Sequence, residues 1–163
     1  MESQTPYPES YDPTHALADA AAARESIAQR LYTPWWYHPI LGLNAGALVL
    51  IVAFAAEGLL LAALGLASIG VSLALIRAYR RITGLWVELK QCGPGSRRLW
   101  GIYMVAVFAA AIPAFCVRFD LLPSWCAWGA AVLIAIASFI IGPRFDGLLR
   151  DEIRDGSAPI GLS

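Results

Sequence analysis

The residues that could do chemistry in this chain are few, and none of them forms a known catalytic or metal-binding pattern. The two histidines, His15 and His38, lie far apart and have no acidic or cysteine partners at metal-ligand spacing. Neither a Gly-x-Ser-x-Gly elbow nor a His-Glu-x-x-His motif occurs, and the glycine-rich turn at 91–95 lacks the Lys-Ser/Thr of a phosphate-binding loop. We therefore expect no catalytic residues, no metal and no cofactor, and a protein that is not an enzyme.

Two polar side chains, Asn44 and Glu57, lie within a long apolar stretch that covers residues 35–76. Asn44 is well inside the stretch, where an amide either bonds to a neighbouring helix or contacts a substrate. Glu57 is followed by Gly58 near the middle, where a carboxylate is either a solvated turn residue or a gate for cations or protons. We favour the structural role for both side chains and keep the functional role as the alternative.

The composition indicates the environment in which these residues work. The chain has 163 residues, of which 58% are hydrophobic and 15% are charged, and its mean hydropathy is +0.60. Soluble domains are about 45–50% apolar and about 25% charged, so this composition points to a lipid bilayer. Twelve Lys and Arg residues balance twelve Asp and Glu residues, and the missing basic excess argues against a nucleic-acid partner.

The apolar runs predict four membrane spans, because about 20 apolar residues in a helix cross a bilayer. The stretch 35–76 is long enough for two spans, 36–56 and 59–76, joined by a tight turn at Glu57-Gly58. The second half predicts spans 99–117 and 122–141, the latter stopped by Gly142-Pro143-Arg144. We predict an all-α integral membrane four-helix bundle, built from two transmembrane hairpins, within a domain at 34–142.

The basic residues predict the orientation of this domain. Eleven of the twelve Lys and Arg residues fall in the N-terminal segment, the loop 77–98 and the tail 143–163, and Arg118 is the twelfth. Cytoplasmic segments carry such an excess, so we expect a plasma-membrane protein with both termini and the loop 77–98 in the cytoplasm.

The segment before the first span divides into two parts. Residues 1–14 are polar and contain prolines, and we expect them to be disordered. Residues 15–33 are rich in alanine and predict a helix with an imperfect apolar stripe. The stripe contains Leu17, Ala20, Ile27 and Leu31. Three alternatives stay open for this helix: it lies on the inner membrane surface, packs on the loop 77–98, or docks a partner through residues 15–31.

Three cysteines are present. Cys92 falls in the predicted cytoplasmic loop, where we expect a reduced thiol. Cys116 and Cys126 flank the outer turn, so they either form a disulfide across the hairpin or remain buried thiols.

Helix packing is predicted at Gly42 and Gly46, a pair of small residues one helical turn apart, with Asn44 between them. This pattern forms a seam either inside the bundle or between copies in a homo-oligomer. Four arginines form a predicted basic cluster near the inner leaflet, and they either fix the topology or bind anionic lipid. The cluster consists of Arg80, Arg81, Arg97 and Arg98.

One motif carries a resemblance to known proteins. The segment Thr33-Pro34-Trp35-Trp36-Tyr37-His38-Pro39, which leads into Leu41-Gly42-Leu43, resembles the entry to the first span in small multi-pass membrane proteins of actinobacteria. The similarity covers residues 16–45 and extends to Thr83-Gly84-Leu85-Trp86. No activity is assigned to those proteins, so the resemblance implies a membrane protein and no particular reaction.

The resulting functional hypothesis is a non-enzymatic accessory or scaffold protein of the membrane. It would act through the helix at 15–33 and the loop 77–98. The alternative is a small transporter or channel subunit that works as an oligomer, with Asn44 and Glu57 facing a shared cavity.

Overall fold

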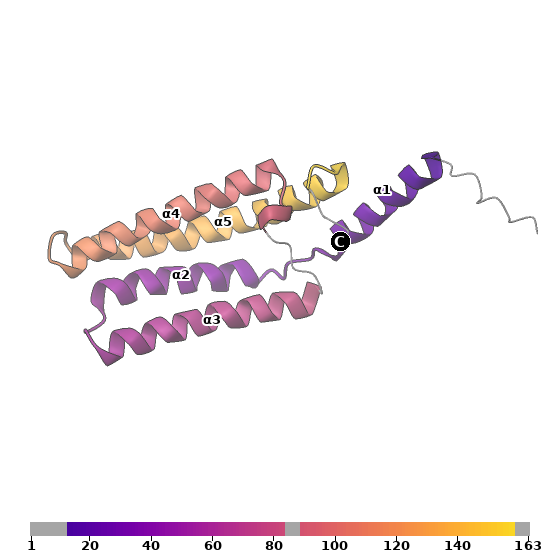
Figure 1. Cartoon of the computed structure of the whole chain (residues 1–163). Coiled ribbons are helices and arrows are strands. Elements are labelled where there is room, and N and C mark those ends of the chain that lie inside the picture. Colours follow the sequence, from indigo (N-terminus) through magenta and orange to yellow (C-terminus); the bar gives the residue numbers. More distant parts are fainter. Residues whose placement is uncertain (1–12, 84–88, 159–163) are drawn as a thin grey trace, which may run out of the picture.

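The computed structural model describes residues 13–83 and 89–158, and this part of the chain is all-α (Figure 1). The helices are α1 (Pro13–Arg30), α2 (Tyr37–Phe54), α3 (Leu59–Thr83), α4 (Pro94–Arg118) and α5 (Trp125–Asp155), with a short 3-10 helix η1 (Leu89–Gln91) before α4. Helices α2 to α5 have the length and apolar composition of membrane spans. The predicted all-α fold with four spans is thus confirmed, and the chain is a multi-pass membrane protein that lies in a lipid bilayer. Of the segment predicted to be disordered, 1–12 lies outside the described residues, while Pro13 and Thr14 begin α1.

Different helix ends and turns lie at the two ends of the bundle (Figure 1). At one end lie α1, the end of α3, the start of α4 and the last turns of α5, and we call it the α1 end. The opposite end, which we call the hairpin end, carries the turn between α2 and α3 and the turn between α4 and α5.

Three of the four spans form the core. Helices α2, α4 and α5 pack on one another through small and branched side chains. The buried members of this core are Val49, Ala53, Ala114, Val117, Ala127, Ala130, Ala131 and Ile134. Helix α3 packs mainly on α2, and most of its large apolar side chains are exposed in the single chain. In a bilayer these side chains meet acyl chains, which cost apolar groups nothing to contact.

A single arginine connects the two hairpins at the hairpin end. Arg118, in the last turn of α4, donates from Nη1 to the backbone oxygens of Val52 (2.9 Å) and Ala55 (3.1 Å). Carbonyl groups at a helix C-terminus lack partners within their own helix, so the guanidinium satisfies the end of α2. The turn that follows α2 reaches α3 through Gly58, whose φ of +83° suits glycine.

Helix α5 runs well past the expected end of the fourth span. The prediction ended that span at residue 141, but the helix continues through Gly142 and Pro143 to Asp155. Pro143 removes one backbone donor and leaves the rest of the helix free to form if packing supports it. That support comes from Leu149, Glu152 and Ile153, which are buried against other elements at the α1 end. In the region 77–98, α3 continues to Thr83, as expected for residues 77–82, and α4 begins at Pro94, while 84–88 lies outside the described residues.

Candidate functional site

A cavity of about 600 Å³ opens at the α1 end of the bundle, between helices α2, α3, α4 and α5. Its walls are mainly apolar and carry five aromatic rings, those of Tyr37, Tyr79, Trp100, Tyr103 and Phe145. A cavity of this size is typical of sites for small organic ligands. The cavity is therefore a candidate site for a small organic ligand.

The principal polar feature of the cavity wall is a pair formed by His38 and Asp146. His38 lies in the first turn of α2, and its Nε2 is 2.8 Å from Oδ2 of Asp146 on the extension of α5. The His38 side chain is only 10% exposed. Its other nitrogen, Nδ1, is buried against Gly142 and has no hydrogen-bond partner among the described residues. The pair is thus a largely buried polar contact between α2 and the extension of α5.

Gly142 makes the close approach of the imidazole possible. A β-carbon at this position would overlap the His38 ring, so no larger residue fits without moving α2 or α5. The absence of a side chain at Gly142 therefore lets the His38 ring pack against the α5 backbone, and α5 remains helical through this position.

A second polar contact lies deeper in the wall. The hydroxyl groups of Tyr103 and Ser138 are 2.8 Å apart, and Ser138 donates its own proton to the backbone oxygen of Ile134 (2.8 Å). Because the serine proton is already used, Tyr103 is the donor to Ser138. The phenol oxygen of Tyr103 thus keeps its acceptor capacity on the cavity side.

A buried glutamate joins α5 to the start of α4 near the cavity. Glu152 of α5 accepts hydrogen bonds at Oε1 from the backbone N–H groups of Gly95 (2.7 Å) and Ser96 (3.1 Å) at the start of α4. A carboxylate at a helix N-terminus satisfies orphan donors and interacts favourably with the helix dipole. Burial, and secondarily the charge of Glu152, raises the pKa of the Cys92 thiol.

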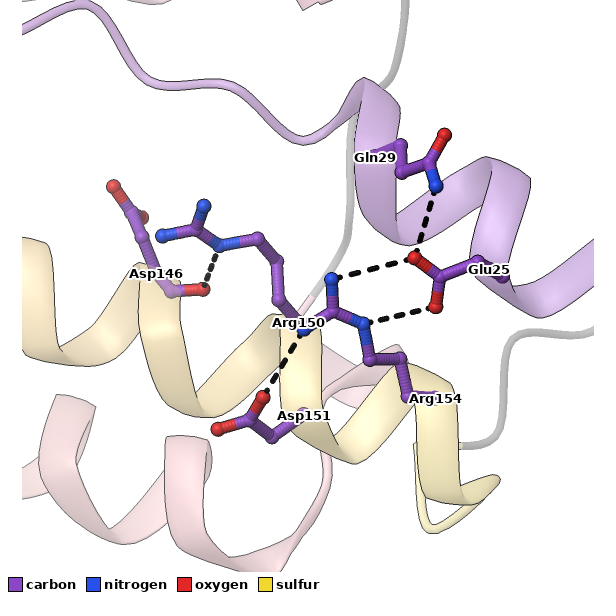
Figure 2. Close-up of polar contacts among 6 residues, drawn as sticks. All are labelled: Glu25, Gln29, Asp146, Arg150, Asp151 and Arg154. Carbon is purple, nitrogen blue, oxygen red and sulfur yellow. Dashed lines mark hydrogen bonds and ion pairs between the residues drawn. The ribbon is translucent and has the colours of Figure 1, made fainter.

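The last turns of α1 pack on the extension of α5. Ala28 and Leu31 are buried there together with Cys92, Leu149 and Ile153. Beside this cluster the carboxylate of α1 residue Glu25 accepts hydrogen bonds from the guanidinium of Arg154 on α5 (3.0 and 3.4 Å) and from Gln29 (3.0 Å) (Figure 2). These hydrogen bonds lower the pKa of Glu25.

The three predicted packing residues face two different helices. Gly42 and Gly46 lie against α5, where added β-carbons would stand 2.8 Å and 2.9 Å from the backbone oxygens of Ala135 and Ala131.

Asn44 faces α3. Its amide nitrogen donates to Ser72 Oγ (3.0 Å) and to the Ser68 carbonyl oxygen (3.3 Å), and Ser68 Oγ donates to Asn44 Oδ1 (3.1 Å). The amide is therefore used in the contact between α2 and α3.

The remaining residues singled out from the sequence are spread over the molecule. Arg80 and Arg81 at the end of α3, and Arg97 and Arg98 in the first turns of α4, are exposed at the α1 end. Glu57 lies at the hairpin end with its side chain 88% exposed, and its Oε1 is 3.4 Å from Arg118 Nη2. Neither Cys116 nor Cys126 forms a disulfide. Within the described residues no three His, Cys, Asp or Glu side chains come together as metal ligands would.

Sequence reasoning missed the partners of His38, Arg118 and Glu152. Each lies more than 50 positions from the residue it contacts, and no local spacing signals such a contact. The Gly93-Pro94-Gly95 segment did carry a signal for a helix start, since proline favours the first helical positions.

No family model matches the chain, and no curated protein or solved structure is significantly similar to it. The structure and composition therefore define the class of protein, a multi-pass membrane protein with four candidate spans after an N-terminal helix.

Proposed function

We propose that this protein is a non-enzymatic accessory protein of the plasma membrane that presents α1 to a helical protein partner. The observation that supports this function is the division of the apolar stripe of α1. Its last member, Leu31, is buried in the cluster with α5, beside Ala28, whereas Leu17 is 72% exposed and Ala20 is also exposed. The stripe thus continues beyond the surface that α5 covers, and its small alanine side chains suit close approach by another helix.

The contacts that hold α1 on α5 support the proposal that α1 is presented to a partner. The α5 extension that holds α1 is in turn joined to the start of α4 through Glu152 and to α2 through the His38–Asp146 pair. A helix held in this way has a defined direction, which lowers the conformational entropy lost when a partner binds.

The orientation belongs to the same proposal. The exposed arginines at the ends of α3 and α4 share the α1 end with α1 itself, and an excess of Lys and Arg favours the cytoplasmic side. We propose that the α1 end faces the cytoplasm. The likeness of residues 16–45 to small actinobacterial membrane proteins is part of this proposal as well, since it suggests the same kind of membrane entry.

The absence of enzymatic activity is proposed on the geometry of the most reactive pair. His38 has one ring nitrogen on Asp146 and the other closed against Gly142, so neither nitrogen is placed to take a proton from a nucleophile.

Site-specific photo-crosslinking in cells tests the partner role. A photo-reactive side chain at Leu17 should give a discrete adduct with another protein, whereas the same group at Leu121, exposed at the hairpin end, should not. Ala20→Asp, on the same stripe, should abolish the Leu17 adduct. Ser26→Asp, which adds the same charge on the opposite side of α1, should leave it unchanged. Adducts at Leu17 with lipid alone, or with a second copy of this chain alone, would contradict the proposal.

A further inference from the structure

We propose that the cavity at the α1 end is a binding site for a hydrophobic organic cation, that is, an amine, quaternary ammonium or phosphonium centre on an apolar body. The proposal uses no residue of α1 and is therefore independent of the proposed accessory function. It follows from the size of the cavity, the charges in its wall and the aromatic rings that face it.

The dimensions and lining fit a compact, largely apolar molecule. At about 600 Å³ the cavity lies within the range of pockets that bury small organic ligands. Leu41, Ile141 and Leu149 add aliphatic surface to the five aromatic rings. Burial of apolar surface against such walls supplies most of the affinity in sites of this kind.

The formal charges favour a cation over an anion. Among the described residues that line the cavity, Asp146 is the one carboxylate, and neither lysine nor arginine contributes to the wall. Arg150, one helical turn after Asp146 on α5, donates from Nε to the backbone oxygen of Asp146 at 3.1 Å (Figure 2). An anionic ligand would therefore meet a carboxylate and no permanent positive charge.

The geometry of Asp146 leaves one oxygen for a ligand. His38 Nε2 lies on Oδ2, while Oδ1 accepts no hydrogen bond from the described part of the chain. The imidazole thus positions the carboxylate, and the closure of its Nδ1 against Gly142 keeps the ring from turning toward the ligand. The Asp146 side chain is fixed by this hydrogen bond and is 16% exposed, so the carboxylate is largely desolvated and is a suitable counter-ion for an ammonium group.

The aromatic rings add a second source of attraction for positive charge. The faces of Trp and Tyr rings carry negative electrostatic potential, and a cation within about 6 Å of a ring centre is attracted to it. Trp100, Tyr37 and Tyr79 line the cavity together with Asp146. The Tyr103 hydroxyl donates its hydrogen bond to Ser138, so its oxygen adds a hydrogen-bond acceptor to the cavity wall.

The test uses the full chain, purified in mild detergent, and a pair of probe ions of the same shape and opposite charge. Tetraphenylphosphonium should bind saturably, with one site per chain, in equilibrium dialysis corrected with empty micelles. Tetraphenylborate should show only the partition that empty micelles show. Equal saturable binding of the two ions, or none of the cation, would overturn the proposal.

Two substitutions locate the site, each with a matched control at the hairpin end. Asp146→Asn should weaken tetraphenylphosphonium binding at least about tenfold, which is the loss of one good charge contact, while Glu57→Gln should leave it unchanged. Trp100→Leu should weaken binding by a similar factor, and Trp125→Leu, at an exposed ring, should not.

The tryptophan pair keeps the test decisive if loss of the His38 partner unfolds the Asp146 variant. Trp100 forms no part of the His38–Asp146 pair, so its substitution probes the cavity wall and not the helix junction. Unchanged affinity in a well-folded Trp100→Leu variant would refute the assignment of the cavity as the site.

Discussion

His38 and Asp146, which are 108 positions apart in the sequence, meet with Nε2 and Oδ2 separated by 2.8 Å. The contact joins the first turn of α2 to α5 at Asp146, about one helical turn beyond Pro143. At the other end of α2, Arg118 of α4 binds the carbonyl oxygens of Val52 and Ala55. Helix α2 is thus held at both ends by polar contacts with the second hairpin, and these contacts set its position along the core.

Alanine substitution of the α2 glycines should lower the free energy of unfolding, whereas alanine at glycines that face open space should raise it. Gly42→Ala and Gly46→Ala place a β-carbon on backbone oxygens of α5, so each should lower the free energy of unfolding by about 1–3 kcal/mol. Gly65→Ala and Gly129→Ala meet no atom within 4 Å and should raise it by up to about 1 kcal/mol. Denaturant unfolding in mixed micelles measures all four. Similar effects in both pairs would show that α2 and α5 do not approach as closely as described.

The amide of Asn44 should contribute to the attachment of α3 to α2. Asn44→Leu removes the contacts with Ser68 and Ser72 and should lower the free energy of unfolding by about 0.6–1.7 kcal/mol, the range for hydrogen bonds between membrane helices. A double-mutant cycle with Ser72→Ala measures the coupling directly, and no coupling would contradict the contact. The transport alternative makes a different prediction, because Asn44→Leu should then abolish flux into liposomes while assembly is kept.

The guanidinium of Arg118 should be needed for the stability of the α2 terminus. Arg118→Met keeps much of the side-chain volume but leaves two carbonyl oxygens without their donor, and we expect a loss of about 1–3 kcal/mol in the free energy of unfolding. Glu57→Gln is the control, since its carboxylate is exposed and an exposed ion pair contributes little. Thermal unfolding of both variants checks this order, and a loss at Glu57 as large as that at Arg118 would assign the effect to the ion pair.

The Cys92 thiol should make the stability of the protein depend on pH. Burial and, less strongly, Glu152 raise the pKa of this thiol in the folded state, so the folded protein keeps the thiol proton to a higher pH than the unfolded chain. The stability linked to this shift is complete below the unfolded pKa of about 8.5 and is lost as the pH rises through the folded pKa. Unfolding of the natural protein and of Cys92→Ala should therefore show a difference in free energy that decreases as the pH rises above about 8.5. The same pH slope in both proteins would rule out the linkage.

The same thiol offers a kinetic check. Alkylation by iodoacetamide requires the thiolate, so Cys92 should react more slowly than a cysteine in the unfolded chain at every pH in this range. The comparison needs Cys116 and Cys126 replaced by alanine, which leaves one reactive group. Equal rates in the folded and unfolded chain would mean that the thiol is exposed.

Much of the architecture follows from local sequence features. Long apolar runs must hydrogen-bond their backbone internally in lipid, so the runs beginning near Tyr37, Leu59, Leu99 and Trp125 become helices whatever their neighbours are. Packing partners are harder to predict. The Gly42/Gly46 pair marks a close approach of some helix, but glycine spacing does not say whether that helix is α3, α5 or a second copy.

The charged and polar contacts at the α1 end could not be predicted from spacing. Asp146 and Glu152 follow Pro143 in a stretch that reads as a tail with mixed charges, and continuation of α5 is what brings them to His38 and to the start of α4. The cavity has the same origin, because its wall is assembled from four helices and the segment before α4.

The sequence by itself determined the class of protein, the number of spans and their pairing into two hairpins, since hydropathy acts on each segment separately and short turns leave no other order. Tertiary structure alone decided that α3 flanks a core of three helices, that α5 continues past Pro143, and that His38 meets Asp146 beside a cavity. Those outcomes depend on contacts between residues far apart in the chain. These contacts stabilise the protein only once the helices are packed, so no local pattern of residues predicts them.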